Sequence, residues 1–191
     1  MKIENINFTL KDGRKAVLRN GQESDAQGLY EYLLKSAAET HFILREPEDC
    51  QRYSIEGEKK FINGSLENPW QLMLVCEVEG KIAGNCQIDF NGKVKLHHRA
   101  NIGIALLKDY WGQGIGSRMF ETMIEAAKNF GGVTRLNLDV VEGNDRALAL
   151  YQKFGFKEVC RFPDALLLKD GTYLAEIKMT KKLDDGQIML S

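Results

Sequence analysis

Three glycines alternate with other residues just before a helical pattern begins. They are Gly112, Gly114 and Gly116, in the run Tyr-Trp-Gly-Gln-Gly-Ile-Gly-Ser that ends at Ser117. Glycine leaves the backbone bare, and the first turn of a helix presents N–H groups that have no partner within the helix. Together with the positive end of the helix dipole, these groups suit a phosphate or pyrophosphate. The alternative is structural, since glycines also permit a tight turn and close helix packing.

The glycine spacing separates this motif from two other phosphate-binding loops. A P-loop has a lysine followed by Ser or Thr after its last glycine, and this loop has no lysine there. A dinucleotide-binding loop has the spacing Gly-x-Gly-x-x-Gly, whereas the spacing here is Gly-x-Gly-x-Gly. Asp139, at the end of the next strand, could contact a ribose. The N-terminal half, however, offers no first strand–helix–strand unit of a dinucleotide-binding domain.

A second motif pairs an amide with a phenol. Asn144 and Tyr151 stand at i and i+7 in the run Asn-Asp-Arg-Ala-Leu-Ala-Leu-Tyr, which places them on one face of a helix. That face is reached from the end of the preceding strand. The alternative is that Asn144 only caps the helix and that Tyr151 is a half-buried core residue.

The elements around these motifs are those of a mixed α/β domain. Apolar patterning predicts strands over 15–19, 71–79, 81–90, 99–107, 134–141, 156–162 and 172–180. It predicts helices after Ser24 and over 55–66, 113–130 and 145–154. Three successive strands with short links indicate an antiparallel meander, and the helix over 113–130 then crosses to a parallel neighbour. We expect a central mixed, mostly antiparallel sheet of about seven strands flanked by about four helices. A single domain over 1–191 would end in a loose tail from about 183.

Together the two motifs closely resemble the GNAT superfamily of N-acetyltransferases, over roughly residues 70–181. The Tyr-Trp-Gly-x-Gly-Ile-Gly form resembles the branch of ribosomal-protein and related small-amine acetyltransferases. The family usually has Gln or Arg where this chain has Trp111. The resemblance implies a GNAT-like fold. It also implies an enzyme that transfers an acetyl group from acetyl-CoA to a primary amine by direct attack.

The resemblance assigns roles to individual residues. The pyrophosphate of acetyl-CoA would lie on Gly112, Gln113, Gly114, Ile115, Gly116 and Ser117. The backbone of Ile104, Ala105 and Leu106 would pair with the pantetheine arm, as an added strand does. Asn144 would contact the cofactor, and Tyr151 would stand at the thiol sulfur as general acid to the CoA thiolate.

Two physical requirements agree with these roles. The strands that end near 107 and 141 must splay to admit the pantetheine, and Gly103 offers the bend. A backbone N–H near Leu106 could polarise the thioester carbonyl and stabilise its developing negative charge.

The sequence leaves open which residue takes a proton from the acceptor. A lysine amine has a pKa of about 10.4 and an α-amine of about 7.7–8.0, so a base or a water chain is needed. Many relatives have a Glu in an Ala-Glu-Ile-Gly setting; this chain has Asn101 there, which cannot be the base. Our candidates are Glu142 and His98 acting through water, with Asp139 and His97 as substitutes. Each could equally be a plain surface or strand-end residue.

Acceptor specificity is expected in the loop over 40–54 and at the hairpin tip near 164–172. Glu46, Glu48 and Asp49 could attract a cationic amine, or could simply form a solvated acidic loop. The acceptor could be a small molecule or the amine of a peptide or protein.

The composition of the chain indicates which kinds of partner are expected. A net charge of −1 gives no general basic field, so neither nucleic acid nor a membrane is expected as a partner. The four cysteines (Cys50, Cys76, Cys86 and Cys160) lack the spacing of a zinc site, so no metal is expected and all four are interpreted as reduced core residues. The absence of a signal sequence and of a membrane-spanning run predicts a cytoplasmic location. An exposed final strand could pair two copies into a homodimer.

Three other functions compete with acetyl transfer. A non-catalytic acyl-CoA-binding sensor module would keep the glycine loop but would not need Tyr151. Covalent catalysis through a cysteine would need a thiol on the thioester path, where none of the four is predicted. A nicotinamide-type oxidoreductase would retain a nucleotide that acetyl-CoA does not displace.

Overall fold

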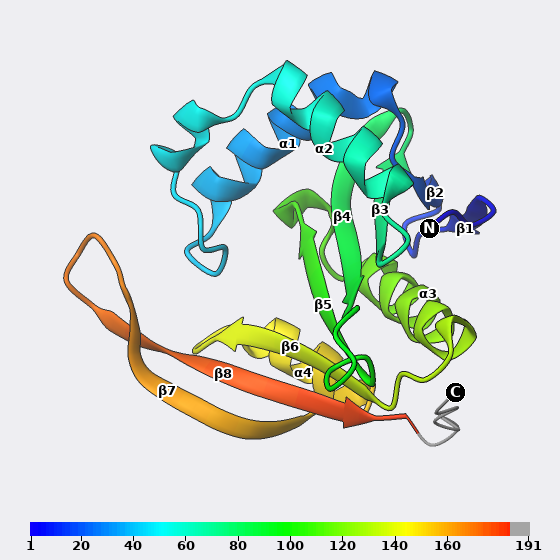
Figure 1. Cartoon of the computed structure of the whole chain (residues 1–191). Coiled ribbons are helices and arrows are strands. Elements are labelled where there is room, and N and C mark those ends of the chain that lie inside the picture. Colours follow the sequence, from blue (N-terminus) through cyan, green and yellow to red (C-terminus); the bar gives the residue numbers. More distant parts are fainter. Residues whose placement is uncertain (184–191) are drawn as a thin grey trace. The chain divides into compact units, whose positions relative to one another are not determined.

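The computed structural model describes residues 1–183, which form two compact units (Figure 1). The first unit comprises residues 1–89 and 104–119; the second comprises 90–103 and the described residues from 120 onward. Strand β5 (Arg99–Leu106) and helix α3 (Ile115–Phe130) are continuous elements that belong partly to each unit. The single domain predicted over 1–191 therefore stays a prediction. The predicted tail, apart from Leu183, lies outside the described residues.

The first unit is built on an antiparallel sheet in the order β1-β2-β3-β4, with the end of β5 beside β4. Its strands are β1 (Ile6–Thr9), β2 (Lys15–Asn20), β3 (Gln71–Val78) and β4 (Lys81–Phe90). Strand β3 is buried along almost its whole length, and Leu72 and Leu74 are fully enclosed. A strand shielded on both faces needs apolar residues at successive positions, which explains the run Leu-Met-Leu-Val-Cys.

Two helices pack against each other in this unit, and the second of them packs on β3 (Figure 1). They are α1 (Ala26–Glu39) and α2 (Ile55–Glu67), separated by a loop that contains the short helix η2 (Asp49–Arg52). Ser54 caps α2, since its hydroxyl accepts a hydrogen bond from the backbone N–H of Gly57 at 3.0 Å. Helix α1 follows the short helix η1 (Glu23–Asp25) and buries Leu29 and Tyr32.

A buried ion-pair network ties the first unit together. The Arg19 guanidinium, 8% exposed, lies 2.6 Å from a carboxylate oxygen of Asp25 and 2.6 Å from one of Glu77. These residues come from β2, η1 and β3. Burial raises the pKa of Asp25, but the hydrogen bonds from Arg19 and Gln22 outweigh it and lower the pKa overall. The network therefore fixes the turn that leads into α1.

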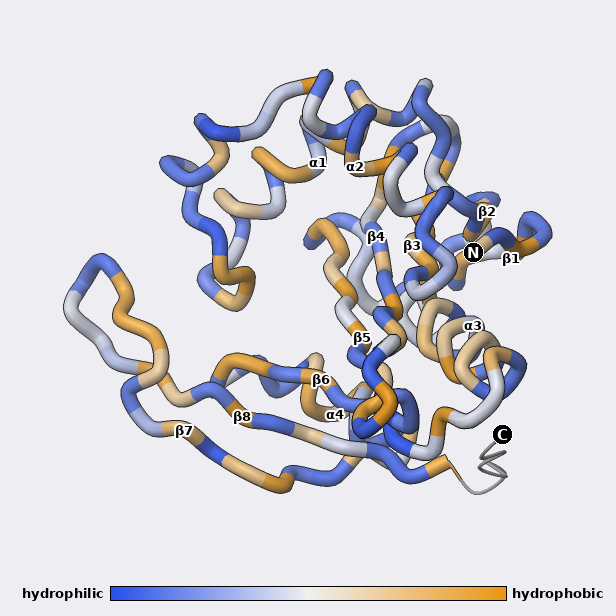
Figure 2. The backbone as a smooth tube through the Cα atoms, in the orientation of Figure 1, coloured by the Kyte–Doolittle hydropathy of each residue, from blue (hydrophilic) through white to orange (hydrophobic). Residues whose placement is uncertain are grey.

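The second unit contains the other half of the sheet, in the order β5-β6-β8-β7. Its further elements are β6 (Arg135–Val141), α4 (Asp145–Lys153), β7 (Lys157–Leu167) and β8 (Tyr173–Lys182). Strand β6 is parallel to β5 and antiparallel to β8, and β7 is the edge strand. Figure 2 shows hydrophobic and hydrophilic residues alternating along β8, as expected for a strand with one buried face.

The predicted fold class is confirmed: the sheet is mixed and mostly antiparallel, and the described part of the chain has four α-helices beside it. In the same residues the sheet has eight strands where we expected about seven, because β1 was missed. Within residues 1–183 this strand pairs with β2, and its residues Ile-Asn-Phe-Thr do alternate between apolar and polar. At four residues the run is too short to stand out in the sequence. Strand β7 ends at Leu167 where we expected about 162. Within residues 1–183, no helix is long and apolar enough to cross a membrane.

Candidate active site

The glycine loop, residues 112–117, joins the short helix η3 (Lys108–Tyr110) to α3. Gly112 and Gly114 have φ values of +75° and +93°, which only glycine adopts without strain, and no atom would lie within 4 Å of a Cβ at either position. The Arg118 N–H donates to the Gly114 carbonyl at 3.2 Å as α3 begins. The bond marks the first turn of α3, and the N-terminal end of a helix carries the positive end of the helix dipole.

The Gln113 side chain is held by the N-terminal hairpin. Its Oε1 accepts a hydrogen bond from the backbone N–H of Asp12 at 3.2 Å, in the turn between β1 and β2. The side chain is thus engaged by the protein itself. The side-chain nitrogen Nε2 takes no part in this bond.

The end of β5 presents its backbone in two directions. The Ala105 carbonyl faces β4, because a Cβ on Gly84 would lie 2.3 Å from it and the Tyr32 hydroxyl lies 3.1 Å from it. Since backbone groups alternate along a strand, Ile104 and Leu106 face the other side. The ladder between β5 and β6 ends at the pair Asn101↔Asn137 in the described part of the chain. Ile104 and Leu106 therefore have the geometry to bind an extended ligand.

Trp111 holds the Leu106 carbonyl. Its indole Nε1 donates to that oxygen at 2.8 Å, and the Lys108 Nζ lies 5.8 Å from the centroid of its ring. Trp111 stands where the family usually has Gln or Arg. Its hydrogen bond fixes the peptide plane at the end of β5, next to the N–H that would polarise a thioester carbonyl.

Asn144 caps α4, and Tyr151 lies within it. The Asn144 Oδ1 accepts a hydrogen bond from the Ala147 N–H at 3.3 Å, so its role as N-cap is confirmed. Tyr151 is 7% exposed and packs its ring 5.3 Å from that of Phe120 and 6.4 Å from that of Phe156. Burial raises the pKa of Tyr151 to about 12, although Arg146 opposes the shift. The phenol therefore keeps its proton at neutral pH.

The Glu142 carboxylate has a partner on each oxygen. Oε1 accepts from Arg161 Nη1 at 2.6 Å, and Oε2 accepts from the Ala175 N–H at 3.1 Å. Asp139 is likewise engaged, at 2.9 Å from Lys178 Nζ.

His98 lies at the opposite end of β6 from Glu142. The His98 carbonyl accepts from the N–H groups of Thr134 and Arg135 at 2.9 and 3.0 Å, at the start of β6, whereas Glu142 follows its last residue. A strand of this length separates the two by roughly 23 Å, so the structure does not bring them together. The His97 Nδ1 contacts the carbonyl oxygen of Val94 in the loop before β5.

Three of the four cysteines are buried, and Cys160 is exposed. The expectation of four core residues is therefore wrong for Cys160, which lies on the edge strand β7. Burial raises the pKa of Cys76 to about 12 and raises that of Cys86 as well. Neutral buried thiols are poor nucleophiles. In the part of the chain that is described, no group of three His, Cys, Asp or Glu side chains is placed to hold a metal ion.

The loop over 40–54 is held by its own polar residues. Arg45 Nη2 donates to Ser36 Oγ at 2.6 Å, and the Asp49 carboxylate accepts from the Glu46 N–H at 3.0 Å. The Asp49 carboxylate is therefore engaged in shaping the loop. Sequence reasoning missed Arg45 and Tyr32, whose contacts with α1, β4 and β5 leave no local pattern.

Comparisons with known proteins agree with this geometry. Residues 27–156 match the acetyltransferase (GNAT) family. The chain is 28% identical over 115 residues to the L-amino acid N-acetyltransferase AaaT of Escherichia coli, covering 60% of this chain and 70% of that protein. It is 33% identical over 98 residues to the [ribosomal protein bS18]-alanine N-acetyltransferase of E. coli, covering 47% of this chain and 66% of that protein.

Among solved structures, the chain resembles the acetyltransferase of the GNAT family from Streptococcus pneumoniae. The TM-score is 0.81 at 28% identity, over 88% of this chain and 99% of that one. The family match covers the end of β5, the glycine loop and α4. The chain belongs to the acetyltransferase (GNAT) family, whose members take the acetyl group from acetyl-CoA.

Proposed function

We propose that this chain transfers an acetyl group from acetyl-CoA to a primary amine by direct attack. The observation that carries the proposal is the glycine loop at the start of α3, next to the end of β5, whose backbone beyond Asn101 has no pair on β6 among residues 1–183. Acetyl-CoA, when bound, supplies an acyl group activated as a thioester. The chain's own residues must hold and orient acetyl-CoA. They must also take a proton from the amine and donate one to the leaving thiolate.

The glycine loop would hold the pyrophosphate. The bare backbone at Gly112, Gly114 and Gly116 and the N–H groups of Ile115 and Ser117 give it a cradle, and Gln113 would contribute its backbone. A Cβ at Gly112 or Gly114 would stand in the space that the ligand requires and would strain the backbone. The absence of a lysine is no obstacle, because peptide N–H groups make the contacts.

The end of β5 would hold the pantetheine arm. Ile104 and Leu106 would pair with it, while Ala105 between them is turned toward β4. The Leu106 N–H would then polarise the thioester carbonyl, with its peptide plane fixed by Trp111. Asn144 would add a cofactor contact beyond its capping role.

Tyr151 would act as the general acid. Its buried phenol keeps a proton at neutral pH and would donate it as negative charge grows on the leaving sulfur. Within residues 1–183 no hydrogen bond of the Tyr151 hydroxyl is found, so no protein group competes for that proton.

The acceptor that fits these residues best is an α-amine, either of an amino acid or at a protein N-terminus. An α-amine has a pKa of about 7.7–8.0, so a substantial fraction is already neutral near pH 7.5. It therefore needs only a weak base, and the paired Glu142 carboxylate acting through water could serve. Two relatives named as N-acetyltransferases of L-amino acids and of a ribosomal-protein alanine support this acceptor class.

His98 remains a second candidate base. Substitutions of Glu142 and of His98 allow the two candidates to be compared directly. Glu142→Gln keeps the hydrogen bond to the Ala175 N–H but removes the basic oxygen, and His98→Ala removes the imidazole. We expect the first variant to lower the rate at pH 7 more than at pH 9, where the α-amine is neutral without help. Unchanged rates in both variants would dispose of both candidates.

The decisive test is a thiol-release assay with acetyl-CoA and a panel of acceptors: L-amino acids, peptides that begin with Ala or Ser, and a polyamine. Release of CoA with α-amines, slowed in Tyr151→Phe, would support the reaction, the acceptor class and the acid. Binding of acetyl-CoA without release for any amine would favour the acyl-CoA sensor. No binding at all would overturn the proposal. A cytoplasmic location and a homodimer stay predictions from the sequence.

A further inference from the structure

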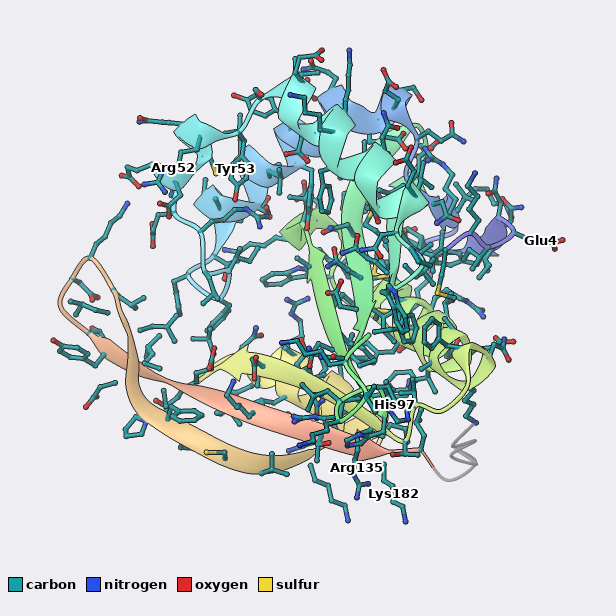
Figure 3. The ribbon with its side chains drawn as sticks, viewed as in Figure 1. Glu4, Arg52, Tyr53, His97, Arg135 and Lys182 are labelled. Carbon is teal, nitrogen blue, oxygen red and sulfur yellow. The ribbon has the colours of Figure 1, made fainter. Side chains whose placement is uncertain are left out.

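A row of cations crosses one face of the sheet in the second unit. Arg99 on β5 is the register partner of Arg135 on β6, and Arg135 is the register partner of Lys182 on β8. Register partners point to the same face, with Cβ atoms about 5 Å apart, and like charges in that arrangement repel. Figure 3 shows Arg135 and Lys182 extending from the ribbon in the same direction. We call Arg99, Arg135 and Lys182 the cation row.

The cation row lies on the more open face of these strands. Leu136, the next residue along β6, is fully buried on the opposite face, whereas Arg99 and Lys182 are exposed. The next row on the open face is polar: Asn137 is the register partner of Asn101 and of Thr180. The Thr180 hydroxyl donates to Asn137 Oδ1 at 3.1 Å or to the Leu136 carbonyl.

No ion pair neutralises the cation row among residues 1–183. The segment 90–103 leads into β5 with Lys93 and Lys95 and contains no Asp or Glu. Lys157, the register partner of Thr180, adds a further cation at the start of β7. The sequence places Asp184 and Asp185 after β8, outside the described residues. Two carboxylates would leave most of these six cations without compensation.

We propose that the cation row binds the phosphates of single-stranded nucleic acid. Arginine is suited to phosphate because its planar guanidinium donates two parallel hydrogen bonds to one group. The rings of His97 and His98 stand just before Arg99, with centroids 6.2 Å apart, and offer surfaces on which unpaired bases can stack. Phosphate contacts and base stacking together are the pattern of single-strand binding.

Other anionic partners fit this surface less well. A membrane-binding face needs several apolar side chains among its cations. Within segment 90–103, Val94 is the single large apolar side chain that is exposed. The core of a protein interface is enriched in aromatic residues and depleted in charge, the reverse of this row. The expectation that no nucleic acid binds came from the net charge, which averages over the chain and hides where the charges lie.

The cation row is separate from Tyr151 and Glu142, the proposed acid and the first candidate base. It lies at the start of β6, whereas Glu142 and α4 follow the end of that strand. Its failure and the failure of the proposed enzyme can therefore be told apart. Acetyl transfer should not change when the cation row is removed.

The test measures fluorescence anisotropy of a labelled oligouridine RNA of about 12 nucleotides with the full chain. Three phosphate contacts predict a slope near −2 in log affinity against log salt, or roughly 20-fold weaker binding at about 200 mM than at about 50 mM salt. The triple variant R99Q/R135Q/K182Q should bind at least about tenfold more weakly at low salt and lose most of this slope. The variant K2Q/K11Q/K60Q removes the same charge from exposed lysines of the first unit and should bind as the wild type does.

Three results would overturn the proposal. They are equal binding by the row variant and the wild type, an equal loss in the control variant, and tighter binding of anionic vesicles or polyglutamate than of the RNA. Should the triple glutamine variant not fold, R99K/R135K gives a second test because it keeps the charge. It should keep the salt slope and bind more weakly, since lysine cannot donate two parallel bonds. Unchanged affinity of R99K/R135K would refute the arginine–phosphate contacts.

Discussion

Tyr151 is the residue whose environment bears most directly on the proposed chemistry. Tyr151→Phe keeps the packing against Phe120 and Phe156 and removes only the acidic proton. We expect the maximal rate of CoA release to fall about 10²–10⁴-fold, with acetyl-CoA affinity little changed. Steady-state kinetics measure both, and Tyr30→Phe on α1 is the control that should leave the rate unchanged. An equal effect of the two substitutions would contradict the general-acid role.

The protonation of Tyr151 gives this prediction a pH dependence. Because burial raises the pKa of the phenol from 10 to about 12, its proton is present at every pH below about 11. The Tyr151 contribution to stability is complete below pH 10 and is lost as the pH rises toward 12. Between pH 7 and 10, ionisation of Tyr151 should therefore cause no fall in the rate. Any fall that the wild type shows in this range should also be present in Tyr151→Phe.

Trp111 is predicted to act through Leu106. Trp111→Phe keeps an aromatic ring but loses the N–H that holds the Leu106 carbonyl. One hydrogen bond of this kind is worth about 1 kcal/mol, so kcat/KM for acetyl-CoA should fall roughly fivefold. Trp111→His restores a ring N–H and should recover part of the loss. If Trp111→His is as slow as Trp111→Phe, with equal melting temperatures, the hydrogen bond has no positioning role.

At this scale the sequence predicts local contacts and misses distant ones. The Asn144 cap and the turn at the glycines follow from neighbours a few residues away, and both are seen in the structure. The ion pair between Glu142 and Arg161 joins a strand end to β7. No periodicity connects those positions, so the sequence could nominate Glu142 but could not reveal its partner.

Among the elements, the parallel pair β5–β6 was predictable, whereas edge strand β1 was missed and edge strand β7 was predicted too short. A long helix between two apolar strands leaves little choice but a crossover. Strand β7 instead passes through Pro163 and Asp164, at an irregularity where Asp164 has a φ of +54°. Proline is tolerated on an edge strand at a bulge because no neighbour needs its N–H. We expected this strand to end at about 162, just before Pro163, whereas β7 continues to Leu167.

The contact between β4 and β5 allows a sharp test with two glycines. A Cβ at Gly84 would lie 2.3 Å from the Ala105 carbonyl, so the backbone must shift, and Gly84→Ala should destabilise the protein by about 1–3 kcal/mol. Gly64 in α2 has open space around it, and Gly64→Ala should stabilise by about 0.5–1 kcal/mol. Urea unfolding measures both. Equal effects would mean that β4 and β5 are not in such close contact.

For the whole molecule, acid stability should depend on the network around Arg19. The pKa of Asp25 is lowered in the folded state, so its contribution to stability is present above a pH of about 4 and is lost as the pH falls below that value. Asp25→Asn should lower the free energy of unfolding at pH 7 by about 3 kcal/mol, since Arg19 would lose a partner while buried. In urea titrations from pH 7 to 2, the gap between wild type and variant should shrink; a constant gap would contradict the shift.

Ligand binding should be visible as a global change in stability. Acetyl-CoA at 100 times its dissociation constant should raise the free energy of unfolding by about 2.7 kcal/mol. Tyr151→Phe should keep this gain, whereas Gly114→Ala, which forces a side chain into a φ of +93°, should lose most of it. Thermal unfolding with and without acetyl-CoA measures the difference. A full gain in Gly114→Ala would show that the loop is not the cradle.

The fold class and the family could be predicted for the molecule as a whole, because they rest on periodicity and short motifs. The charge placement could not, because Arg99, Arg135 and Lys182 are brought together only by sheet register. Because the three residues lie far apart in the sequence, no local pattern indicates that they cluster. The summed charge of −1 hides it as well.

The hydrogen bond between Asp12 and Gln113 bears on where a shortened form of this protein can begin. The family match begins at residue 27, beyond the hairpin β1–β2 that supplies the Asp12 N–H. A protein trimmed to that boundary would keep both motifs by which its relatives are recognised. It would lose Arg19, two strands and the hydrogen bond that holds the Gln113 side chain. A homologue that lacks these residues would still match the family over the same range, and we expect it to bind acetyl-CoA more weakly.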